Sequence, residues 1–391
     1  HAYEVQWDCL SRTSGEPQSL WVVGFTAGNQ LARRLPDVSS KPLARPALSP
    51  GARTFALELP ERLEALPLLL AALTLVQGCA PSPPSGGVWI LTKAIFDFGL
   101  NDKLQPSFAG PWGLSRSARS EQPSLRVRCA DVGNATNGAH HFGALMGIVH
   151  SEPEVVVRRD LLHAPRLANA RRGSEVDDEL SAVISEGATD HLLTGGTGGL
   201  GVVVASWLAK QASGSRLVLV SRSASLSSEA AARLRGSGAA DIALERCNVA
   251  ECFEVSLLTA TMQHTTRPLC GVWHTAGVLA DGLLAGQDAS KLQRVYGSKA
   301  ISAWHLHRAH FATPLQTCVY FSSVAALVGG AAQANYASAN VCLDALSAGR
   351  RIQACNAVSV EWGPWAEAGM AAGGAINSRM VAMGFGLIES W

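Results

Sequence analysis

Four polar side chains are spaced along the sequence so that together they could move a proton. Ser323 closes an apolar run, Tyr336 follows thirteen residues later, and Asn340 stands four residues after Tyr336, the spacing of one helical face. A phenol has a reference pKa of about 10, so it exchanges protons near neutrality only beside a cation. Lys299 is the candidate cation. Ser323 could then hold a carbonyl oxygen while Tyr336 gives a proton to it.

A glycine-dense segment indicates a site for a pyrophosphate. The segment lies between a predicted strand and a predicted helix. Its glycines let the backbone turn sharply and approach a phosphate, whose charge is met by the free amides at the start of the helix. The alternative is a structural turn without a ligand. The residues predicted to bind a dinucleotide here are Thr194, Gly195, Gly196, Thr197, Gly198, Gly199, Leu200 and Gly201.

The end of the next predicted strand favours one of the two nicotinamide cofactors. Ser221, Arg222 and Ser223 stand where an enzyme that prefers NAD would place a carboxylate for the ribose 2′-hydroxyl. A guanidinium presents several donors that suit a 2′-phosphate, which a carboxylate would repel. The sequence therefore predicts NADPH. The alternative is a solvated arginine at a strand end.

Two α/β units are expected to position these residues, because apolar β-branched runs followed by helix-length segments occur before about residue 165 and again from about residue 188. We place the boundary near residue 185, which gives the parts 1–185 and 186–391. The first part is expected to contain strands at 20–25, 87–92, 125–132, 154–157 and 161–165 and a helix at 62–76. The second is expected to contain strands at 191–194, 217–220, 271–275, 318–322 and 357–362, with helices at 202–211, 288–310 and 336–347. Such alternation is typical of a doubly wound parallel sheet.

Composition excludes several other classes of function. Charged residues make up 16% of the chain and the formal net charge is +1, so no overall field attracts nucleic acid or anionic lipid. The longest apolar stretch, 66–76, is well short of the ~20 residues of a membrane span. Nine cysteines without a Cys-x-x-Cys pair argue against a disulfide framework and a zinc site, and favour the cytoplasm. Because the first residue is His1, we expect a domain excised from a longer chain.

Three neighbouring histidines raise the question of a metal site. His305, His307 and His310 would point in divergent directions around one helix, unlike ligands spaced by four on one face. We therefore expect no metal site.

Together these motifs resemble the ketoreductase domain of modular type I polyketide synthases, a branch of the short-chain dehydrogenase/reductase superfamily. The first part resembles the structural subdomain of that family, a truncated dinucleotide fold without a cofactor, through segments 110–116, 125–132 and 152–154. The resemblance thus implies two Rossmann-like subdomains, of which the second is catalytic. In the second part it rests on 194–201, 221–223, His274-Thr275-Ala276-Gly277, Lys299, Ser322-Ser323, Gln333-Ala334-Asn335-Tyr336, Asn340 and Trp362-Gly363-Pro364-Trp365.

The resemblance implies NADPH-dependent reduction of a β-ketoacyl thioester, carried by a phosphopantetheinyl acyl carrier protein, with neighbouring synthase domains as further partners. Tyr336 would protonate the keto oxygen, Ser323 would orient it, and Lys299 would bind the nicotinamide ribose. Asn340 would support them, and its position fits a family in which Lys and Asn are exchanged relative to most short-chain dehydrogenases. The implied cofactor contacts beyond the glycine and arginine segments are Asn248, Val249, His274, Thr275, Ala276, Gly277, Lys299, Tyr336, Pro364 and Trp365.

The same resemblance bears on the configuration of the product. Asp281 is the last residue of a Leu-Ala-Asp segment that stands in place of the Leu-Asp-Asp of ketoreductases giving the D-hydroxyl. Val328 stands where the opposite class has Trp. We therefore predict the B-type, D-hydroxyl product, and assign Asp281, Gln333 and Met370 to substrate binding and stereocontrol.

Three alternatives remain at this point. The chain could be the ketoreductase domain of an animal-type fatty acid synthase, which shares most of these motifs. It could bind NADPH without reducing, as a structural spacer or an epimerase, although the intact proton-transfer residues argue against this. A free-standing dehydrogenase would leave the first part of the chain unexplained.

Overall fold

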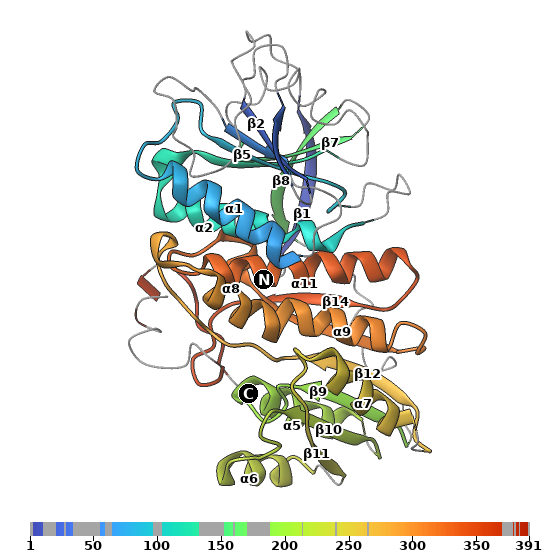
Figure 1. Cartoon of the computed structure of the whole chain (residues 1–391). Coiled ribbons are helices and arrows are strands. Elements are labelled where there is room, and N and C mark those ends of the chain that lie inside the picture. The colour runs from blue at the N-terminus through green and yellow to red at the C-terminus, as the bar shows by residue number, and fades with distance from the viewer. Residues whose placement is uncertain are drawn as a thin grey trace. The chain divides into compact units, whose positions relative to one another are not determined.

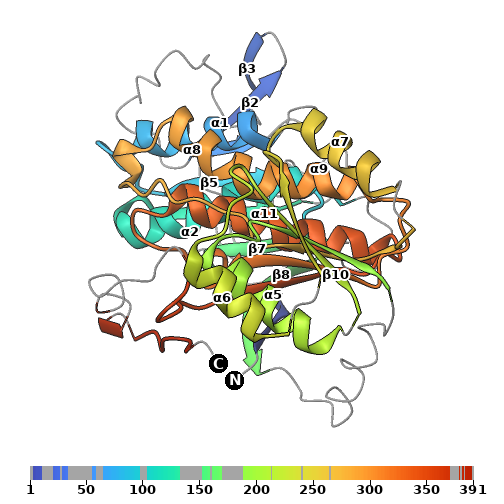
Figure 2. The ribbon, with the colours of Figure 1, turned by 90° about the horizontal axis from the view of Figure 1, so that it is seen from below.

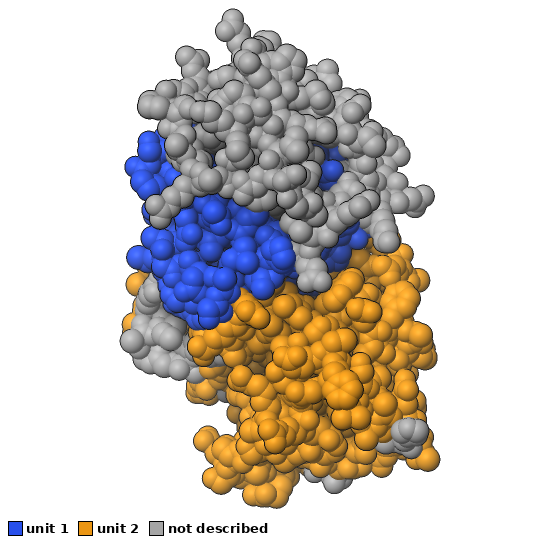
Figure 3. All heavy atoms as spheres, in the orientation of Figure 1, with its two compact units in different colours: residues 1–171, 280–292, 325–345 blue, residues 172–279, 293–324, 346–391 orange. Residues whose placement is uncertain are grey.

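The structure is a computed structural model (Figure 1), and the residues it describes are 3–10, 21–26, 29–33, 55–58, 65–96, 104–132, 152–158, 161–169, 188–212, 214–238, 241–263, 266–369, 378, 381–382 and 384–389. The chain divides into two compact units, coloured separately in Figure 3. Unit 1 consists of residues 1–171, 280–292 and 325–345, and unit 2 consists of 172–279, 293–324 and 346–391. Two later segments thus group with the first part of the chain. Residue 185, the predicted boundary, lies outside the described residues and stays a prediction.

Unit 1 is built on an eight-stranded sheet with the order β1-β8-β7-β6-β5-β4-β2-β3. The five strands β2, β4, β5, β6 and β7 are parallel neighbours, while β8, β1 and β3 pair antiparallel at the two edges. The predicted strands of the first part are all present, whereas β1, β3 and β4 were not predicted. Their bounds are β1 Tyr3–Leu10, β2 Trp21–Thr26, β3 Asn29–Arg33, β4 Phe55–Glu58, β5 Val88–Thr92, β6 Val127–Asp131, β7 Glu154–Arg158 and β8 Leu161–Asn169.

Two helices of unit 1 pack against each other and against strands β5 and β6 (Figure 1). Helix α1, Ala65–Cys79, extends past the predicted end at residue 76 and buries most of its leucines. Helix α2, Gly110–Glu121, carries a proline in its first turn, where the missing N–H has no helical partner to lose. Pro123 then closes it, because the residue before a proline is disfavoured in the helical conformation.

Unit 2 is built on six parallel strands with the order β11-β10-β9-β12-β13-β14. The order of succession reverses between β9 and β12, which is the doubly wound topology that the sequence predicts. All five residues of β9 are buried, as expected for a strand covered on both faces. The bounds are β9 Asp190–Thr194, β10 Arg216–Ser221, β11 Ile242–Arg246, β12 Leu269–His274, β13 Thr317–Ser323 and β14 Val358–Trp362.

The helices of unit 2 pack as two pairs, α5 with α6 and α7 with α9, which flank the strands in Figure 2. The predicted single helix over 288–310 is wrong in one respect, because a π-helical turn at Gly297–Ile301 separates α8 from α9. No helix among the described residues is long and apolar enough to cross a membrane. The bounds of the remaining helices of the chain are α5 Gly199–Gln211, α6 Ser228–Gly236, α7 Cys252–Gln263, α8 Ala289–Tyr296, α9 Ser302–Ala309, α10 Val324–Val328 and α11 Ala334–Ile352. Of these, α8 begins in unit 1 and ends in unit 2, while most of α10 and α11 belongs to unit 1.

Candidate functional site

A pocket of about 630 Å³ lies in unit 2 at the carboxyl ends of the strands, where the order of β9 and β12 reverses. Ligands of doubly wound sheets bind at this switch point, because the helices on the two faces leave a crevice there. The turns that follow β9, β10, β11 and β12 all contribute to its lining. The predicted cofactor residues that line it are Gly195, Thr197, Gly198, Gly199, Leu200, Gly201, Ser221, Arg222, Asn248, Val249, Thr275, Ala276 and Gly277.

Close packing explains why glycines occupy the turn after β9. Gly195 has φ of +70°, and a Cβ there would lie 2.7 Å from the Cα of Ala276. A Cβ on Gly201 would lie 2.3 Å from the carbonyl oxygen of Gly195. Helix α5 begins at Gly199 with Gly198 as its N-cap, so its first amides face the pocket end of the turn. A side chain at Gly195 would therefore clash with the segment that follows β12, and one at Gly201 would push the start of α5 away from the turn.

Behind the pocket, His274 joins the first strand of unit 2 to the π-helical turn. The ring is fully buried, and Nε2 lies 3.0 Å from the carbonyl oxygen of Lys299. Since a carbonyl only accepts, Nε2 carries the proton, and Nδ1 accepts from the hydroxyl of Thr194 at 2.7 Å. Burial and the Lys299 ammonium lower the pKa of His274 to about 3. His274 is therefore a neutral bridge with both ring nitrogens occupied.

Ser323 ends strand β13, and the side chain of Lys299 contacts the same end of that strand. Lys299 lies on the π-helical turn, is 3% exposed, and its Nζ donates to the carbonyl oxygen of Phe321 at 2.8 Å. Ser323 is the last residue of β13, two positions after Phe321. A one-turn π-bulge in a helix frequently marks a functional position, and here it carries the ammonium group. Unit 2 thus holds the predicted cation and the predicted serine at one strand end.

Tyr336 and Asn340 lie on the part of α11 that belongs to unit 1. The Asn340 side chain is buried, and its Nδ2 donates to the backbone carbonyl of Tyr336 at 2.9 Å. Asn335 fixes the start of the helix, because its Oδ1 accepts from the Tyr336 amide at 2.7 Å while its Nδ2 donates to the carbonyl of Ala280 at 2.7 Å. The tyrosine is therefore tied through Asn335 to the segment that carries Asp281.

Several predicted residues of unit 2 lie outside the lining of this pocket, and Met370 lies outside the described residues. Trp365 is buried, with its ring centroid 5.1 Å from that of Trp362, and it forms an isolated β-bridge with Ile388. Trp365 therefore belongs to the packed interior of unit 2. The other predicted residues of unit 2 that do not line the pocket are Thr194, Gly196, Ser223, His274, Lys299, Ser323 and Pro364.

The sequence interpretation missed one wall of the pocket. Arg294, Gly297, Ser298 and Ile301 line it from α8 and the π-helical turn. Their spacing by three and four residues is the signal that could have found them, because such residues share one face of a helix. Arg294 adds a second exposed guanidinium to that of Arg222.

The three neighbouring histidines have separate partners. His305 Nδ1 donates to the carbonyl of Val249 at 3.3 Å, and His307 Nδ1 accepts from Arg350 at 3.0 Å. His310 Nε2 lies 3.5 Å from the hydroxyl of Thr259. Within the part of the chain that the structure describes, no group of three His, Cys, Asp or Glu side chains could hold a metal ion.

Comparison with known protein families matches the two halves of the chain separately. A family model described as the KR domain matches residues 189–367. A second, described as the Rossmann fold domain of the polyketide synthase extender module SpnB, matches residues 5–167. Together the two matches cover both units.

The individual relatives are long synthases, and this chain matches a part of each. Polyketide synthase GfsA from Streptomyces halstedii is 37% identical over 282 residues, which are 71% of this chain and 3% of that synthase. The pikromycin synthase component PikAIII from Streptomyces venezuelae is 33% identical over 316 residues, 78% of this chain and 20% of PikAIII. The chain therefore spans a small fraction of the relatives it matches.

Solved structures match nearly the whole chain. A structure described as A-type ketoreductases from a modular polyketide synthase has a TM-score of 0.83 and 27% identity, covering 99% of this chain and 88% of that one. The first ketoreductase of the tylosin synthase has a TM-score of 0.79 and 26% identity, covering 99% of this chain and 87% of that one.

Proposed function

Because the chain belongs to the family of polyketide synthase ketoreductase domains, we propose that it uses NADPH to reduce a β-ketoacyl thioester to a β-hydroxyacyl thioester. The substrate is carried by a phosphopantetheinyl acyl carrier protein, and neighbouring synthase domains are further partners. The observation that carries the proposal is the pocket at the switch point of unit 2, which combines the glycine turn with Arg222.

The pocket supports a cofactor that bears a phosphate on its ribose. The amides at the start of α5 would bind the pyrophosphate. Two guanidinium groups, Arg222 and Arg294, line the same pocket and can donate to a 2′-phosphate. Bound NADPH supplies the hydride. His274, neutral and fully hydrogen-bonded, holds the wall behind the pocket in place.

The chain's own residues would then handle the oxygen and its proton. Ser323 donates a hydrogen bond to the keto oxygen and orients it, and Tyr336 gives its phenolic proton to that oxygen as the charge develops. Lys299 supports the cofactor ribose and the phenol with its buried ammonium group. Asn340 fixes the turn of helix that bears Tyr336.

We further propose that the product is of B-type, with the D-hydroxyl. Support comes from the exposed Asp281 and from Val328, which is 52% exposed and stands where the opposite class has Trp. The solved relative described as A-type is 27% identical, which leaves the local residues to decide the configuration. Chiral analysis of the alcohol formed from one ketoacyl thioester tests this part, and the L-hydroxyl as main product would overturn it.

The reduction is tested by following NADPH absorbance with a 2-methyl-3-ketoacyl thioester as surrogate substrate. We expect the chain to oxidise NADPH, and Tyr336→Phe to lower the rate by about 10²- to 10⁴-fold, the usual contribution of general acid catalysis. Tyr336→Phe should bind NADPH as the unmodified chain does, because the pocket is lined by residues of unit 2. A folded Phe variant with substantial turnover would refute the role of Tyr336. An unmodified chain that binds NADPH without oxidising it would instead support a spacer or an epimerase.

A further inference from the structure

Helix α2 of unit 1 holds the segment 325–345 at successive points along its length. The guanidinium of Arg116 donates to the carbonyl of Ala326, and the hydroxyl of Ser117 accepts from the Gly330 amide at 3.3 Å. One turn earlier on α2, a Cβ on Gly113 would lie 2.5 Å from the backbone of Ala337. The backbones of the two helices therefore touch beside Tyr336, so α2 lies along the stretch that leads into the tyrosine.

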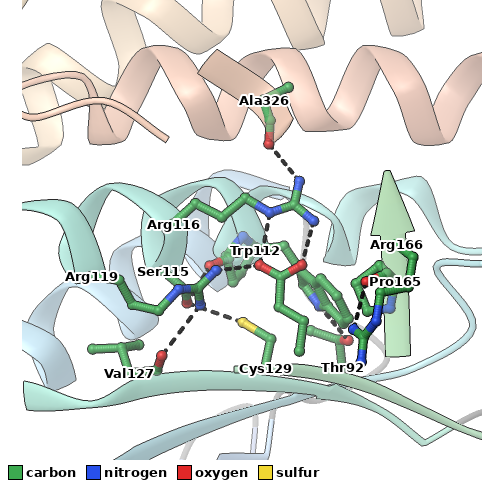
Figure 4. A network of polar contacts seen from close by, with 12 residues as sticks. Thr92, Trp112, Ser115, Arg116, Arg119, Val127, Cys129, Pro165, Arg166 and Ala326 are labelled. Carbon is green, nitrogen blue, oxygen red and sulfur yellow. Dashed lines mark hydrogen bonds and ion pairs between the residues drawn. The ribbon is translucent and has the colours of Figure 1, made fainter. Parts of the chain in front are cut away.

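Arg116 is itself held in place by a buried ion pair, which is shown in Figure 4. Arg116 makes two hydrogen bonds to the carboxylate of Glu154, at 2.8 and 2.6 Å, and Arg119 contacts the same carboxylate. Burial would raise the pKa of Glu154, but Arg116 and Arg119 outweigh it and lower that pKa. Glu154 thus stays ionised and keeps Arg116 aimed at the carbonyl of Ala326.

At the end of α2, Glu121 joins two segments that are distant in sequence. Its Oε1 accepts from the Ala332 amide at 2.8 Å, and its Oε2 accepts from the Leu284 amide at 2.6 Å. The same two segments also meet directly, because the Gly282 amide donates to the Ala332 carbonyl at 2.8 Å. Ala332 has φ of +68°, an uncommon conformation for a residue with a side chain, so its backbone needs such restraints.

The loop around Leu284 is also held from helix α1. The side-chain amide of Gln77 donates to the carbonyls of Leu284 and Gln287, at 2.8 and 2.9 Å. Gln287 in turn donates to the Gly282 carbonyl at 2.6 Å. The loop that contains Asp281 is therefore fixed from two helices of unit 1. Of the side chains of α1 and α2 described above, Glu121 bonds both this loop and the tyrosine segment, which Asn335 also connects through the Ala280 carbonyl.

We propose that Glu121 is a positioning residue for the reduction, whose carboxylate sets the spacing between the loop that carries Asp281 and the segment that carries Gln333 and Tyr336. This inference rests on the proposed function. A carboxylate is needed because it offers two acceptors and no donor, and both of its partners are amide donors. By setting this spacing, Glu121 fixes how the acyl chain is presented to the tyrosine and hence which alcohol forms.

The test compares Glu121→Gln with Glu152→Gln. Glu152 pairs with Arg166, which is 42% exposed, so the control makes the same chemical change at a surface ion pair of unit 1. Glutamine keeps one acceptor but turns an NH₂ group toward a backbone N–H. We expect hydrogen exchange at the Leu284 and Ala332 amides to quicken by about tenfold or more in Glu121→Gln, since a charge-assisted bond is lost.

The same variant is expected to lower the ratio of the two alcohol products by about tenfold, while its dissociation constant for NADPH stays within about twofold. Glu121→Asp keeps both acceptors on a shorter side chain, so its product ratio should fall between those of the unmodified chain and Glu121→Gln. This second variant serves as the folded comparison should Glu121→Gln unfold.

Two results would overturn the inference. Exchange rates at Leu284 and Ala332 that match those of Glu152→Gln would show that Glu121 does not hold the segments. Faster exchange with an unchanged product ratio would show that the hydrogen bonds made by Glu121 do not position the substrate. An unmodified chain without reductase activity would refute the proposed function, while the exchange measurement would still decide whether Glu121 joins the two segments.

Discussion

Unit 1 and unit 2 are both built around parallel strands, but the strands follow one another differently. In unit 2 the succession reverses between β9 and β12, and a pocket of about 630 Å³ lies at that point. In unit 1 the parallel strands β2, β4, β5, β6 and β7 succeed one another in a single direction. Ligands of such sheets bind where the order reverses, because a crevice forms there, and the pocket of unit 2 lies at such a point. Unit 1 contributes instead by holding the segments 280–292 and 325–345.

The two units also hold their buried carboxylates differently, and the largest expected effect follows from that difference. Glu154 of unit 1 is 6% exposed in its side chain and is shared by two arginines, whereas Asp190 of unit 2 pairs with Arg216, which is 24% exposed. Glu154→Ala would leave the guanidinium of Arg116, which is 12% exposed, without its carboxylate, and should lower the free energy of unfolding by about 3–5 kcal/mol. Asp190→Ala should cost less, because Arg216 can turn to water. Urea denaturation measures both, and equal losses would contradict the comparison.

A matched pair of glycine substitutions separates the roles of the two units. Gly201→Ala places a Cβ 2.3 Å from the carbonyl oxygen of Gly195, in the turn after β9. Gly113→Ala places a Cβ 2.5 Å from the backbone of Ala337, on the helix that bears Tyr336. Overpacking costs about 1–3 kcal/mol, so each substitution should lower the quantity it affects, NADPH affinity or turnover, by about ten- to a hundredfold. We expect Gly201→Ala to weaken NADPH binding. Gly113→Ala should lower turnover and leave NADPH binding within about twofold.

The control for this pair is Gly236→Ala, because a Cβ there has nothing within 4 Å. This variant should bind NADPH and turn over like the unmodified chain, with stability equal or slightly raised by the lower entropy of its unfolded state. Binding is measured by NADPH fluorescence titration and turnover by absorbance. Loss of NADPH binding in Gly113→Ala would show that the two units do not act separately.

The contrast between the units also explains how far the sequence alone could reach. The glycine turn, Arg222 and the individual strands were predictable, because each is marked by a pattern of residue types within a short stretch of sequence. The positioning role of Glu121 was not, since its partners Leu284 and Ala332 lie 163 and 211 residues away. The π-helical turn that carries Lys299 shows no local signal distinct from an ordinary helix.

Buried histidines make the stability of unit 2 sensitive to acid. Burial and the charge of Arg350 lower the pKa of His310, which is 3% exposed, to about 4. In the unfolded chain the reference value is about 6.5, so between these values the unfolded state binds a proton that the folded state does not. The free energy of unfolding therefore falls as the pH drops below about 6.5. In unit 1, Glu154 has a lowered pKa, so its contribution is lost only at more acidic pH.

His310→Gln tests this difference, because glutamine can still contact Thr259 but does not titrate. Between pH 6 and pH 5 the unmodified chain should lose stability more steeply than the variant, by at most about 1.4 kcal/mol per pH unit. Urea denaturation at a series of pH values measures the slope. Identical slopes would mean that His310 is protonated in the folded chain as readily as in the unfolded one.

The smallest expected effect concerns the choice of cofactor, which the comparison assigns to unit 2 alone. Arg222 lines the pocket but is exposed, so water and salt weaken its attraction to a phosphate. Arg222→Ala should therefore reduce the preference for NADPH over NADH, measured as the ratio of kcat/KM values, by about tenfold or less. Arg294→Ala removes the other guanidinium group that lines the pocket and is measured in the same assay. Glu121→Gln should leave this ratio unchanged, because among the described residues no group of unit 1 lines the pocket. A changed ratio in that variant would show that unit 1 also takes part in cofactor recognition.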